Sequence, residues 1–344
     1  MRIVVDAMGS DNAPHPEVQG AVEASLIEDI EIILVGDEST LKPELAKYSK
    51  HGKIEIKHAS ERVLMQDKPM IAVRKKKDSS LLVGLRLIKS GGADAFLSAG
   101  NTGAVMMGSR VILGPIPGVN RSAICQALPT TDSGRVVILD LGANVDCTAE
   151  QLCQFAEMGQ VYAQLTLGVE KPRVGLINIG EEQAKGNDIA KTVHRNLTAA
   201  EHINFIGNIE PKALFTGKAD VVVCDGFTGN IILKTTEAVA GLMKNIVQEE
   251  LMSSWITKLG ALLCLNAFNS VKKRSDPNET IGAQLLGTNG IVTIVHGSCT
   301  ATGIKNALLG AKEEFDLGLN QHIRIGIEEL RKDVEGIPRL HASS

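Results

Sequence analysis

The sequence has little cysteine and no long apolar run. Its six cysteines form no C-x-x-C pair and no paired histidine spacing accompanies them, which excludes a disulfide framework and a structural zinc site. No stretch of about 18 apolar residues occurs, and the apolar start of the chain stops at Asp6, too early for a signal peptide. We therefore expect reduced thiols and a cytoplasmic protein that is neither exported nor membrane-spanning.

The chain also lacks an excess of positive charge, internal repeats and an obvious linker. Its 36 Lys and Arg against 40 Asp and Glu give a net charge of −4, so the molecule repels polyanions and no nucleic-acid partner is expected. The 44% of hydrophobic residues is typical of an ordered globular protein. We expect one large α/β domain over 1–344, with two lobes around one cleft as the alternative organisation.

The two common nucleotide-binding motifs are missing. No G-x-G-x-x-G follows the first apolar run, and the Gly-Lys pairs at 52–53 and 217–218 do not precede Ser or Thr as in a P-loop. A metal-dependent hydroxy-acid dehydrogenase would need a carboxylate cluster and a Lys or Tyr base, and the chain has only Tyr48 and Tyr162 as tyrosines. We therefore expect no nucleotide cofactor and no metal.

The chain does contain short apolar runs that alternate with helix-length segments. Continuous apolar strands separated by helices are typical of a mostly parallel sheet covered on both faces, so we predict a three-layer α/β/α fold. The predicted strands lie at 2–7, 30–36, 53–59, 93–100, 122–128, 135–142, 173–180, 203–210, 219–226 and 290–297.

Six of these strands run into a small or polar turn that opens the next helix. At the carboxyl edge of a parallel sheet, helix N-termini present free N–H groups to anions, so we expect the six turns to line one cleft. Glycine-containing turns such as those at 98–104, 142–146 and 224–230 together predict an anion site with several contacts. The six turns read DAMGSDNAP, LSAGNTGA, DLGANVD, NIGEEQAKGND, CDGFTGN and HGSCTATG.

A cationic run at 74–77 precedes Asp78 and two serines that can cap the next helix. It could be a solvated face, a nucleic-acid patch or one side of an anion site, and the acidic net charge weighs against the second. We favour an anion site reached by Arg74 or Lys77, because Arg suits bidentate oxyanion contacts and Lys suits point-charge contacts. Lys185 is a further candidate cation near the cleft.

No activated nucleophile is evident. Cys299 follows His296 by three residues, which could suggest a Cys/His pair, but isolated cysteines are usually buried apolar groups. Neither Ser79 nor Ser80 lies in a G-x-S-x-G elbow. The sequence therefore offers anion donors without a covalent nucleophile, as suits a substrate that supplies the attacking anion itself.

One segment, 244–274, breaks the alternation. It keeps a helical period, becomes apolar at Ala261, Leu262, Leu263 and Leu265, and ends in Lys272, Lys273 and Arg274. We predict a protruding amphipathic helical segment. A core or dimer-forming helix and a cation-flanked apolar tip at an anionic bilayer are the two interpretations of it.

Taken in order and spacing, these motifs resemble those of the bacterial phosphate acyltransferases of phospholipid synthesis (the PlsX family). The resemblance runs from about residue 1 to about 335 and also includes KPMIAVRKKKDSSL and LLGTNGIVTIVHG. Ser10 stands where the family usually has Gly, which affects only the backbone of that turn.

The resemblance implies transfer of a long acyl group from acyl carrier protein to inorganic phosphate, and a downstream glycerol-3-phosphate acyltransferase that uses the acyl phosphate. It also implies a Rossmann-like fold similar to the isocitrate/isopropylmalate dehydrogenase and phosphotransacetylase group, a homodimer, and loose attachment to the inner face of the cell membrane. Membrane contact would fall to Ala261, Leu262, Leu263 and Leu265, and carrier contact to Lys185.

Phosphate is already an anion, so it can attack the thioester directly once bound and aligned. Asp225, Asp146 and His296 are alternative proton donors to the leaving thiolate. A thioesterase, a phosphotransacetylase-like enzyme and a non-enzymatic membrane-surface protein are the alternative functions. The residues expected to hold phosphate and the oxyanion are Arg74, Lys77, Ser98, Gly100, Asn101, Thr102, Gly103, Asn144, Gly226, Thr228, Gly229 and Asn230.

Overall fold

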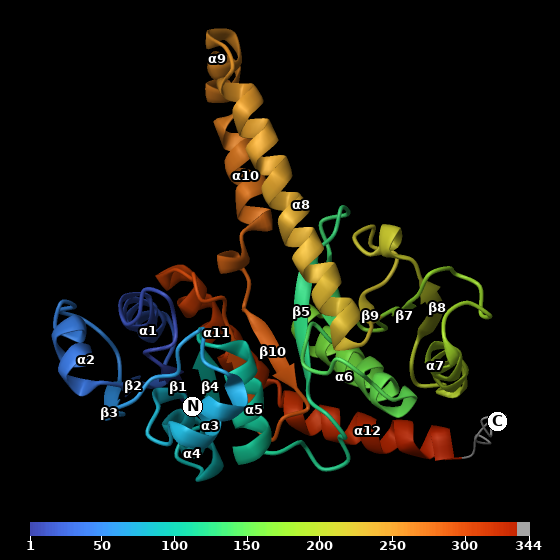
Figure 1. The fold of residues 1–344 in the computed structure, drawn as a ribbon, viewed down its shortest axis with the longest axis horizontal. Helices are drawn as coiled ribbons and strands as arrows, with labels where there is room; N and C mark the ends of the chain where they lie inside the picture. The colour runs from blue at the N-terminus through green and yellow to red at the C-terminus, as the bar shows by residue number, and fades with distance from the viewer. Residues whose placement is uncertain (336–344) are drawn as a thin grey trace.

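The computed structural model describes residues 1–335, without the side chains of 272–275, 277 and 335. One sheet runs through two lobes, and a long helical hairpin rises between them (Figure 1). Helices α1 to α5 lie in the first lobe, at the left of the view. Helices α6 and α7 lie in the second lobe, at the right, and α12 runs beneath it.

The described part of the chain forms an eleven-stranded sheet with the order β3-β2-β1-β4-β11-β10-β5-β6-β9-β7-β8. Most neighbouring strands are parallel, but β10 pairs antiparallel with β11 and β5, and β5 pairs antiparallel with β6. The strands of the second lobe therefore run opposite to those of the first. The strands are β1 (Arg2–Asp6), β2 (Glu31–Gly36), β3 (Ile54–His58), β4 (Ala95–Ser98), β5 (Ala123–Pro129), β6 (Arg135–Leu139), β7 (Val174–Ile177), β8 (Phe205–Ile209), β9 (Val221–Val223), β10 (Ala283–Leu286) and β11 (Ile291–Ile294).

Helices cover both faces of the sheet, which confirms the predicted three-layer α/β/α fold. In the first lobe, α1 packs on α11 over one face while α4 and α5 cover the other; in the second lobe, α6 packs against α12 and α7. The helices are α1 (His15–Ile27), α2 (Glu38–Leu45), α3 (Pro69–Lys75), α4 (Ser80–Lys89), α5 (Thr102–Ile112), α6 (Ala149–Leu167), α7 (Asp188–Ala199), α8 (Gly226–Met252), α9 (Trp255–Leu263), α10 (Leu265–Ser275), α11 (Ala301–Asp316) and α12 (Leu319–Glu335), with 3₁₀ turns η1 (Pro211–Ala213) and η2 (Pro277–Glu279).

The apolar runs become strands because both of their faces are buried. Successive side chains of a strand point to opposite faces. In β1, Ile3 and Val5 therefore enter the core under α1 and α11, while Val4 enters the core under α4 and α5. In β9, Val222 joins the same core as Val4, whereas Val221 packs toward α6. This shared core joins the two lobes.

The hairpin of α8, α9 and α10 projects away from both lobes (Figure 1). Only Gly226 and Gly229 of α8 are buried, and no residue of α9 is. The predicted segment 244–274 covers the second half of α8 together with α9 and α10. The side chains of Lys272, Lys273 and Arg274 lie outside the described part. None of the helices within 1–335 combines the length and apolar character needed to cross a bilayer.

Candidate active site

The six polar turns form two clusters, so the expectation that all of them lie at one edge of the sheet is wrong. The turns after β1, β4 and β11 make up the first cluster, and the turns after β6, β7 and β9 make up the second. Strand direction reverses between the lobes, which places the carboxyl ends of these two sets at opposite edges. Each cluster is held by its own hydrogen bonds.

A buried carboxyl group organises the first cluster. The Ser98 hydroxyl donates to Asp6 at 2.8 Å and accepts from the Gly100 amide at 3.0 Å. Burial raises the pKa of Asp6, against the lowering effect of its Ser80 and Ser98 hydrogen bonds. A Cβ atom on Gly9 would lie 2.8 Å from the Gly100 nitrogen, so this glycine lets the two turns touch. Ser98 thus links the Gly100 amide to the Asp6 carboxyl group.

Asn101 is the N-cap of α5. Its Oδ1 accepts from the Ala104 amide at 3.0 Å, and its Nδ2 donates to the carbonyls of Leu64, Met65 and Asp67 at 3.3, 2.9 and 3.0 Å. The side chain is therefore occupied in joining the turn to the 64–67 loop. Thr102 follows it, exposed at the start of the helix.

The cationic run 74–77 was expected just before α4. In the structure, Arg74 and Lys75 belong to the last turn of α3, and Lys76 and Lys77 follow that helix. Lys76 pairs with Asp67 at 2.6 Å, and Lys77 donates from Nζ to the Val73 carbonyl at 3.1 Å. Arg74 is exposed on the last turn of α3, and within residues 1–335 its guanidinium makes no hydrogen bond or ion pair. Among the described residues Arg74 and Lys75 are thus the two exposed cations of this run without a hydrogen bond or ion pair, and Arg74 is the one that was predicted to reach an anion.

His296 and Cys299 lie in the same cluster but do not form a pair. The His296 Nδ1 atom is 2.8 Å from the Ser298 hydroxyl. Cys299 is buried, and burial raises the pKa of its thiol to about 12. The thiol is therefore protonated at neutral pH and is not an activated nucleophile.

A second buried carboxyl group, Asp140, organises the second cluster. It accepts hydrogen bonds from the amides of Ile124, Ala143 and Asn144 at 2.9, 3.0 and 2.7 Å, and from Asn144 Nδ2 at 2.9 Å. Burial is the largest influence on Asp140 and raises its pKa. The Asn144 side chain also donates to the Ser122 carbonyl at 2.8 Å, so it supports the turn.

The first amides of α8 are mostly occupied. Asp225 caps the helix by accepting from the Thr228 amide at 2.7 Å, Gly226 donates to the Asn144 carbonyl at 2.7 Å, and Gly229 donates to the Asp225 carbonyl at 2.9 Å. A Cβ atom on Gly229 would lie 1.9 Å from the Asp140 carbonyl oxygen, so only glycine fits there. Asn230 follows, with an exposed side chain beside Gly142.

A pocket of about 780 Å³ opens between the ends of β7 and β9 and the starts of α6, α7 and α8. Cys147, Leu152, Leu176 and Cys224 are its buried floor. Of the described residues that line it, none is Lys or Arg, and five are polar or acidic: Asp146, Asn178, Asn187, Asp225 and Thr228. We call this space the apolar pocket.

The rim of the apolar pocket is formed by exposed apolar side chains. Their exposure ranges from 42% for Ile189 to 81% for Ile179. Exposed apolar side chains that gather at a pocket mouth are typical of a binding surface, whereas single exposed apolar side chains occur on most proteins. The rim residues are Val145, Ile179, Ile189, Phe227 and Ile231.

Lys185 lies in the loop beside the apolar pocket. The Asn178 side chain donates to the Lys185 carbonyl at 3.1 Å, and the Asn208 side chain donates to the Glu182 carbonyl at 2.8 Å. These bonds fix the loop, while the Lys185 side chain is exposed next to Gly186, which lines the pocket.

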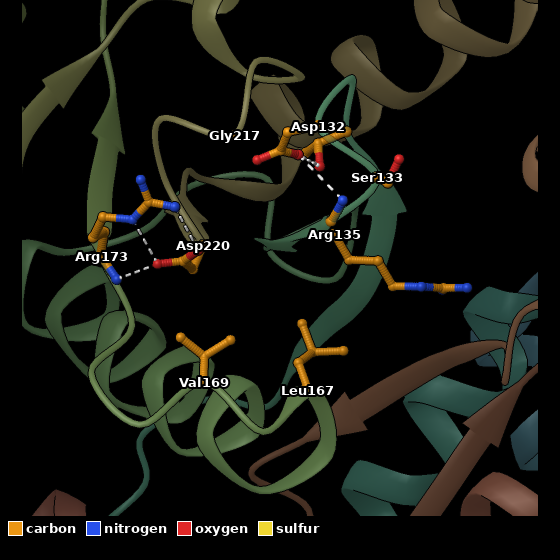
Figure 2. Close-up of a pocket in the computed structure, with 10 residues that line it drawn as sticks. Asp132, Ser133, Arg135, Leu167, Val169, Arg173, Gly217 and Asp220 are labelled. Carbon is orange, nitrogen blue, oxygen red and sulfur yellow. Dashed lines mark hydrogen bonds and ion pairs between the residues drawn. The ribbon is translucent and has the colours of Figure 1, made fainter.

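A smaller pocket of about 330 Å³ lies at the opposite ends of β6, β7 and β9 (Figure 2). Arg173 and Asp220 form a two-pronged ion pair there, with Nε to Oδ2 at 2.9 Å and Nη2 to Oδ1 at 2.8 Å. Leu167 and Val169 point toward the space, and the Arg135 guanidinium points away from it. This pocket holds none of the predicted site residues.

Comparison with known proteins decides the family. The family model described as "Fatty acid synthesis protein" matches residues 1–322. A phosphate acyltransferase of Pelotomaculum thermopropionicum is 45% identical over 330 residues, covering 96% of each chain, and one of Halothermothrix orenii is 46% identical over 338 residues, covering 97% of this chain and 100% of the relative. The chain belongs to the phosphate acyltransferase family. It is an acyltransferase, and the resemblance drawn from its motifs is confirmed.

Solved structures agree on the fold. A phosphotransacetylase of Streptococcus pyogenes superposes with a TM-score of 0.61 at 17% identity, covering 95% of this chain and 94% of its own. The EutD phosphotransacetylase of Staphylococcus aureus gives 0.60 at 17% identity, with 94% of both chains covered. At this identity the likeness concerns the fold alone, and it confirms the predicted similarity of fold to the phosphotransacetylase group.

Sequence reasoning missed the apolar pocket and a buried acid, Glu17. Glu17 accepts from the Ser10 amide at 3.0 Å, and burial raises its pKa to about 7. The motifs did contain a signal for the pocket, since Val145, Ile179, Phe227 and Ile231 stand inside or beside the predicted polar turns. Only the fold shows that these apolar side chains surround one space.

Proposed function

We propose that the enzyme transfers a long-chain acyl group from acyl carrier protein to inorganic phosphate and forms acyl phosphate for phospholipid synthesis. A phosphate oxygen attacks the thioester carbonyl carbon and gives a tetrahedral oxyanion. The carbon–sulfur bond then breaks, and the carrier thiolate leaves and takes up a proton. A downstream glycerol-3-phosphate acyltransferase consumes the product.

The burial of the cysteines at the two clusters is the observation that carries this proposal. Cys147, Cys224 and Cys299 lie at the two clusters, and burial raises their pKa values, to about 11 for Cys147 and about 12 for Cys299. None of the three supplies a thiolate at neutral pH. Attack by phosphate itself needs no enzyme nucleophile, which favours an acyltransferase over a thioesterase.

The exposed cation Arg74, with Lys77 as the alternative, is proposed to bind phosphate together with the Thr102 and Gly103 amides at the start of α5. Asn230 is proposed to stabilise the oxyanion. Asp225, Asp146 and His296 remain alternative proton donors. Direct attack requires both clusters to contribute to one site, within one chain or between two copies.

Release of free thiol from palmitoyl-acyl carrier protein, measured with and without inorganic phosphate, tests the reaction. Hydroxylamine in the assay traps acyl phosphate as a hydroxamate. We expect thiol release that depends on phosphate and matches hydroxamate formation mole for mole. Release without phosphate would identify a thioesterase and contradict the proposal.

We further propose that the hairpin tip attaches the enzyme to the inner face of the cell membrane. Leu262, Leu263 and Leu265 are 61%, 81% and 49% exposed, and Ala261 lies beside them. Exposed apolar side chains at the end of a projecting helix can enter the bilayer interface. Lys185, exposed beside the apolar pocket, is proposed to contact the acidic carrier protein.

Leu262→Glu tests the membrane contact, because a carboxylate in the interface opposes insertion. We expect the variant to stop sedimenting with anionic vesicles while it keeps its activity on soluble acyl carrier substrate. Leu26→Glu is the matched control, since Leu26 is similarly exposed, at 59%, on α1. Equal sedimentation of the wild type and Leu262→Glu would contradict the proposed contact.

We also propose a homodimer. Val239, Leu242 and Met243 are more than half exposed on α8. A row of apolar side chains on a helix is suited to packing against a second copy. Light scattering of the purified protein should give twice the monomer mass of 36.6 kDa, and Leu242→Asp should lower it.

A further inference from the structure

The apolar pocket has the wrong chemistry for phosphate. No cation among the described residues lines it, while two carboxyl groups, Asp146 and Asp225, do. The thiols of Cys147 and Cys224 in its floor are held neutral by burial. An anion placed here would meet repulsion and an apolar floor, whereas a neutral chain of methylenes would bury its surface.

The helix starts at the pocket also offer few free donors. The amides of Gly226, Thr228 and Gly229 are already bonded to Asn144 or Asp225. At α7, the Ala190 amide donates to the Asn187 side chain at 2.8 Å. The polar groups at this pocket are therefore largely satisfied by the protein, and the apolar surface is left without a partner.

We infer that the apolar pocket holds the acyl chain of the donor, and that its depth determines which chain lengths are transferred. The inference rests on the proposed function, because it needs a long-chain acyl donor. A volume of about 780 Å³ is in the range of roughly 300–1,000 Å³ found for pockets that enclose small ligands. The exposed rim residues Ile179, Phe227 and Ile231 extend the apolar surface toward solvent, where the carrier protein would stand.

Ala190→Phe tests the depth of the pocket, because Ala190 lines it from the first turn of α7. The added ring occupies space that a long chain needs and a short chain does not. We expect the ratio of kcat/KM for palmitoyl- over octanoyl-acyl carrier protein to fall at least about tenfold, since each methylene in an apolar site is worth about fourfold. The KM for phosphate should stay within about twofold of the wild-type value.

Ala199→Phe is the matched control. Ala199 is exposed on the last turn of the same helix and lies outside the apolar pocket. The control should keep the wild-type chain-length ratio. Melting temperatures of both variants show whether the ring is tolerated by the fold.

Ile231→Ala keeps the inference testable if Ala190→Phe does not fold. Ile231 is 49% exposed at the pocket rim, and Ile27, 60% exposed at the end of α1 and outside the pocket, supplies the control Ile27→Ala. Removing three carbons of apolar contact should raise the KM for palmitoyl-acyl carrier protein by about tenfold in Ile231→Ala only.

The outcomes separate the inference from the proposed function. A wild-type enzyme that releases no thiol in a phosphate-dependent way would refute the proposed function and the inference with it. An active enzyme whose folded Ala190→Phe and Ile231→Ala variants keep the wild-type ratio and KM would refute the pocket assignment alone. A raised phosphate KM with an unchanged chain-length ratio would place phosphate, not the acyl chain, in the pocket.

Discussion

Both clusters at the strand ends are organised by a buried carboxyl group, but they differ in the groups that remain available to a ligand. Each has a buried carboxyl group that gathers hydrogen bonds from a glycine-containing turn, Asp6 in the first cluster and Asp140 in the second. In the first, the exposed Arg74, which has no partner among the described residues, and the exposed start of α5 are available to a ligand. In the second, the first amides of α8 are mostly used internally and an apolar pocket remains.

This difference shows that a polar turn is not by itself an anion site. Whether a turn can bind an anion depends on which of its donors the protein has already used and on the charges beside it. We therefore propose the first cluster for the anionic substrate and the second for the apolar substrate. The first three predictions below test that assignment and the construction of the second cluster, and the fourth tests the packing of the second lobe.

The largest expected effect is on catalysis at the second cluster. Asn230→Ala should lower kcat by about 10²–10³, because Asn230 is proposed as an oxyanion donor. Its side chain is exposed, so the free energy of unfolding should change little. Asn245→Ala, an exposed asparagine further along α8, is the control and should be fully active. A fall in kcat of less than threefold would remove Asn230 from the mechanism.

Gly229→Ala should damage the construction of the second cluster. The new Cβ would meet the Asp140 carbonyl oxygen, so the helix start or the turn must shift, at a cost of about 3 kcal/mol of unfolding free energy. Gly241→Ala in the same helix meets nothing within 4 Å and should stabilise the protein by up to about 1 kcal/mol. Urea denaturation measures both, and equal stabilities would show that the close approach is not required.

Arg74→Ala should separate the two substrates. Losing a charge-assisted contact to phosphate should raise the KM for phosphate by about tenfold or more, with the KM for the acyl donor unchanged. Lys75→Ala, the exposed neighbouring cation, is the control for loss of surface charge. A rise in the KM for the acyl donor instead would reverse the assignment of the clusters.

The smallest expected effect is a pH dependence confined to the second lobe. His202 lies between Glu157, at 2.8 Å, and Asp333 of α12, at 2.7 Å, and its hydrogen bond with Glu157 is the main cause of a pKa raised from 6.5 to about 9. A raised histidine pKa stabilises the fold fully below pH 6.5, and this stabilisation is lost as the pH rises through 9.

Between pH 7 and 9.5 we expect the unfolding free energy of the wild type to fall by about 1 kcal/mol more than that of His202→Gln. The expected value is modest because the two ion pairs of His202 are partly solvated. The exposed His322→Gln variant should follow the wild type. Hydrogen exchange should place the change in α12 and α6. Identical pH profiles for the wild type and His202→Gln would show that the ion pairs add nothing.

Most of the fold was predictable because its strands are buried on both faces and therefore read as continuous apolar runs. The exception is β10, Ala283–Leu286, which no prediction included. It is short, has no β-branched residue and lies between Gly282 and Gly287, whose positive φ angles of 82° and 79° end the strand at both sides. This strand and its antiparallel neighbours reverse the strand direction, and that reversal separated the turns expected at one edge.

The candidate site was predictable only in part. The polar turns and their helix starts could be located from the sequence. Which of their hydrogen-bond donors are already bonded within the protein could not be predicted. Asn101 and Asn144 are residue types that often bind ligands, yet their side chains bond to backbone carbonyls brought near by distant segments, and that of Asn144 also to the nearby Asp140 carboxyl group. Ile179, likewise, is 81% exposed, although its apolar side chain would usually be buried.

Helix α8 connects the apolar pocket to the tip of the hairpin. Its first turn carries Phe227 at the rim of the apolar pocket, and its far end, Met252, leads directly into the hairpin tip. A helix of 27 residues is about 40 Å long and bends little over that distance. Because Phe227 and the hairpin belong to one continuous helix, a tilt of the hairpin about its base would move the pocket rim together with the tip.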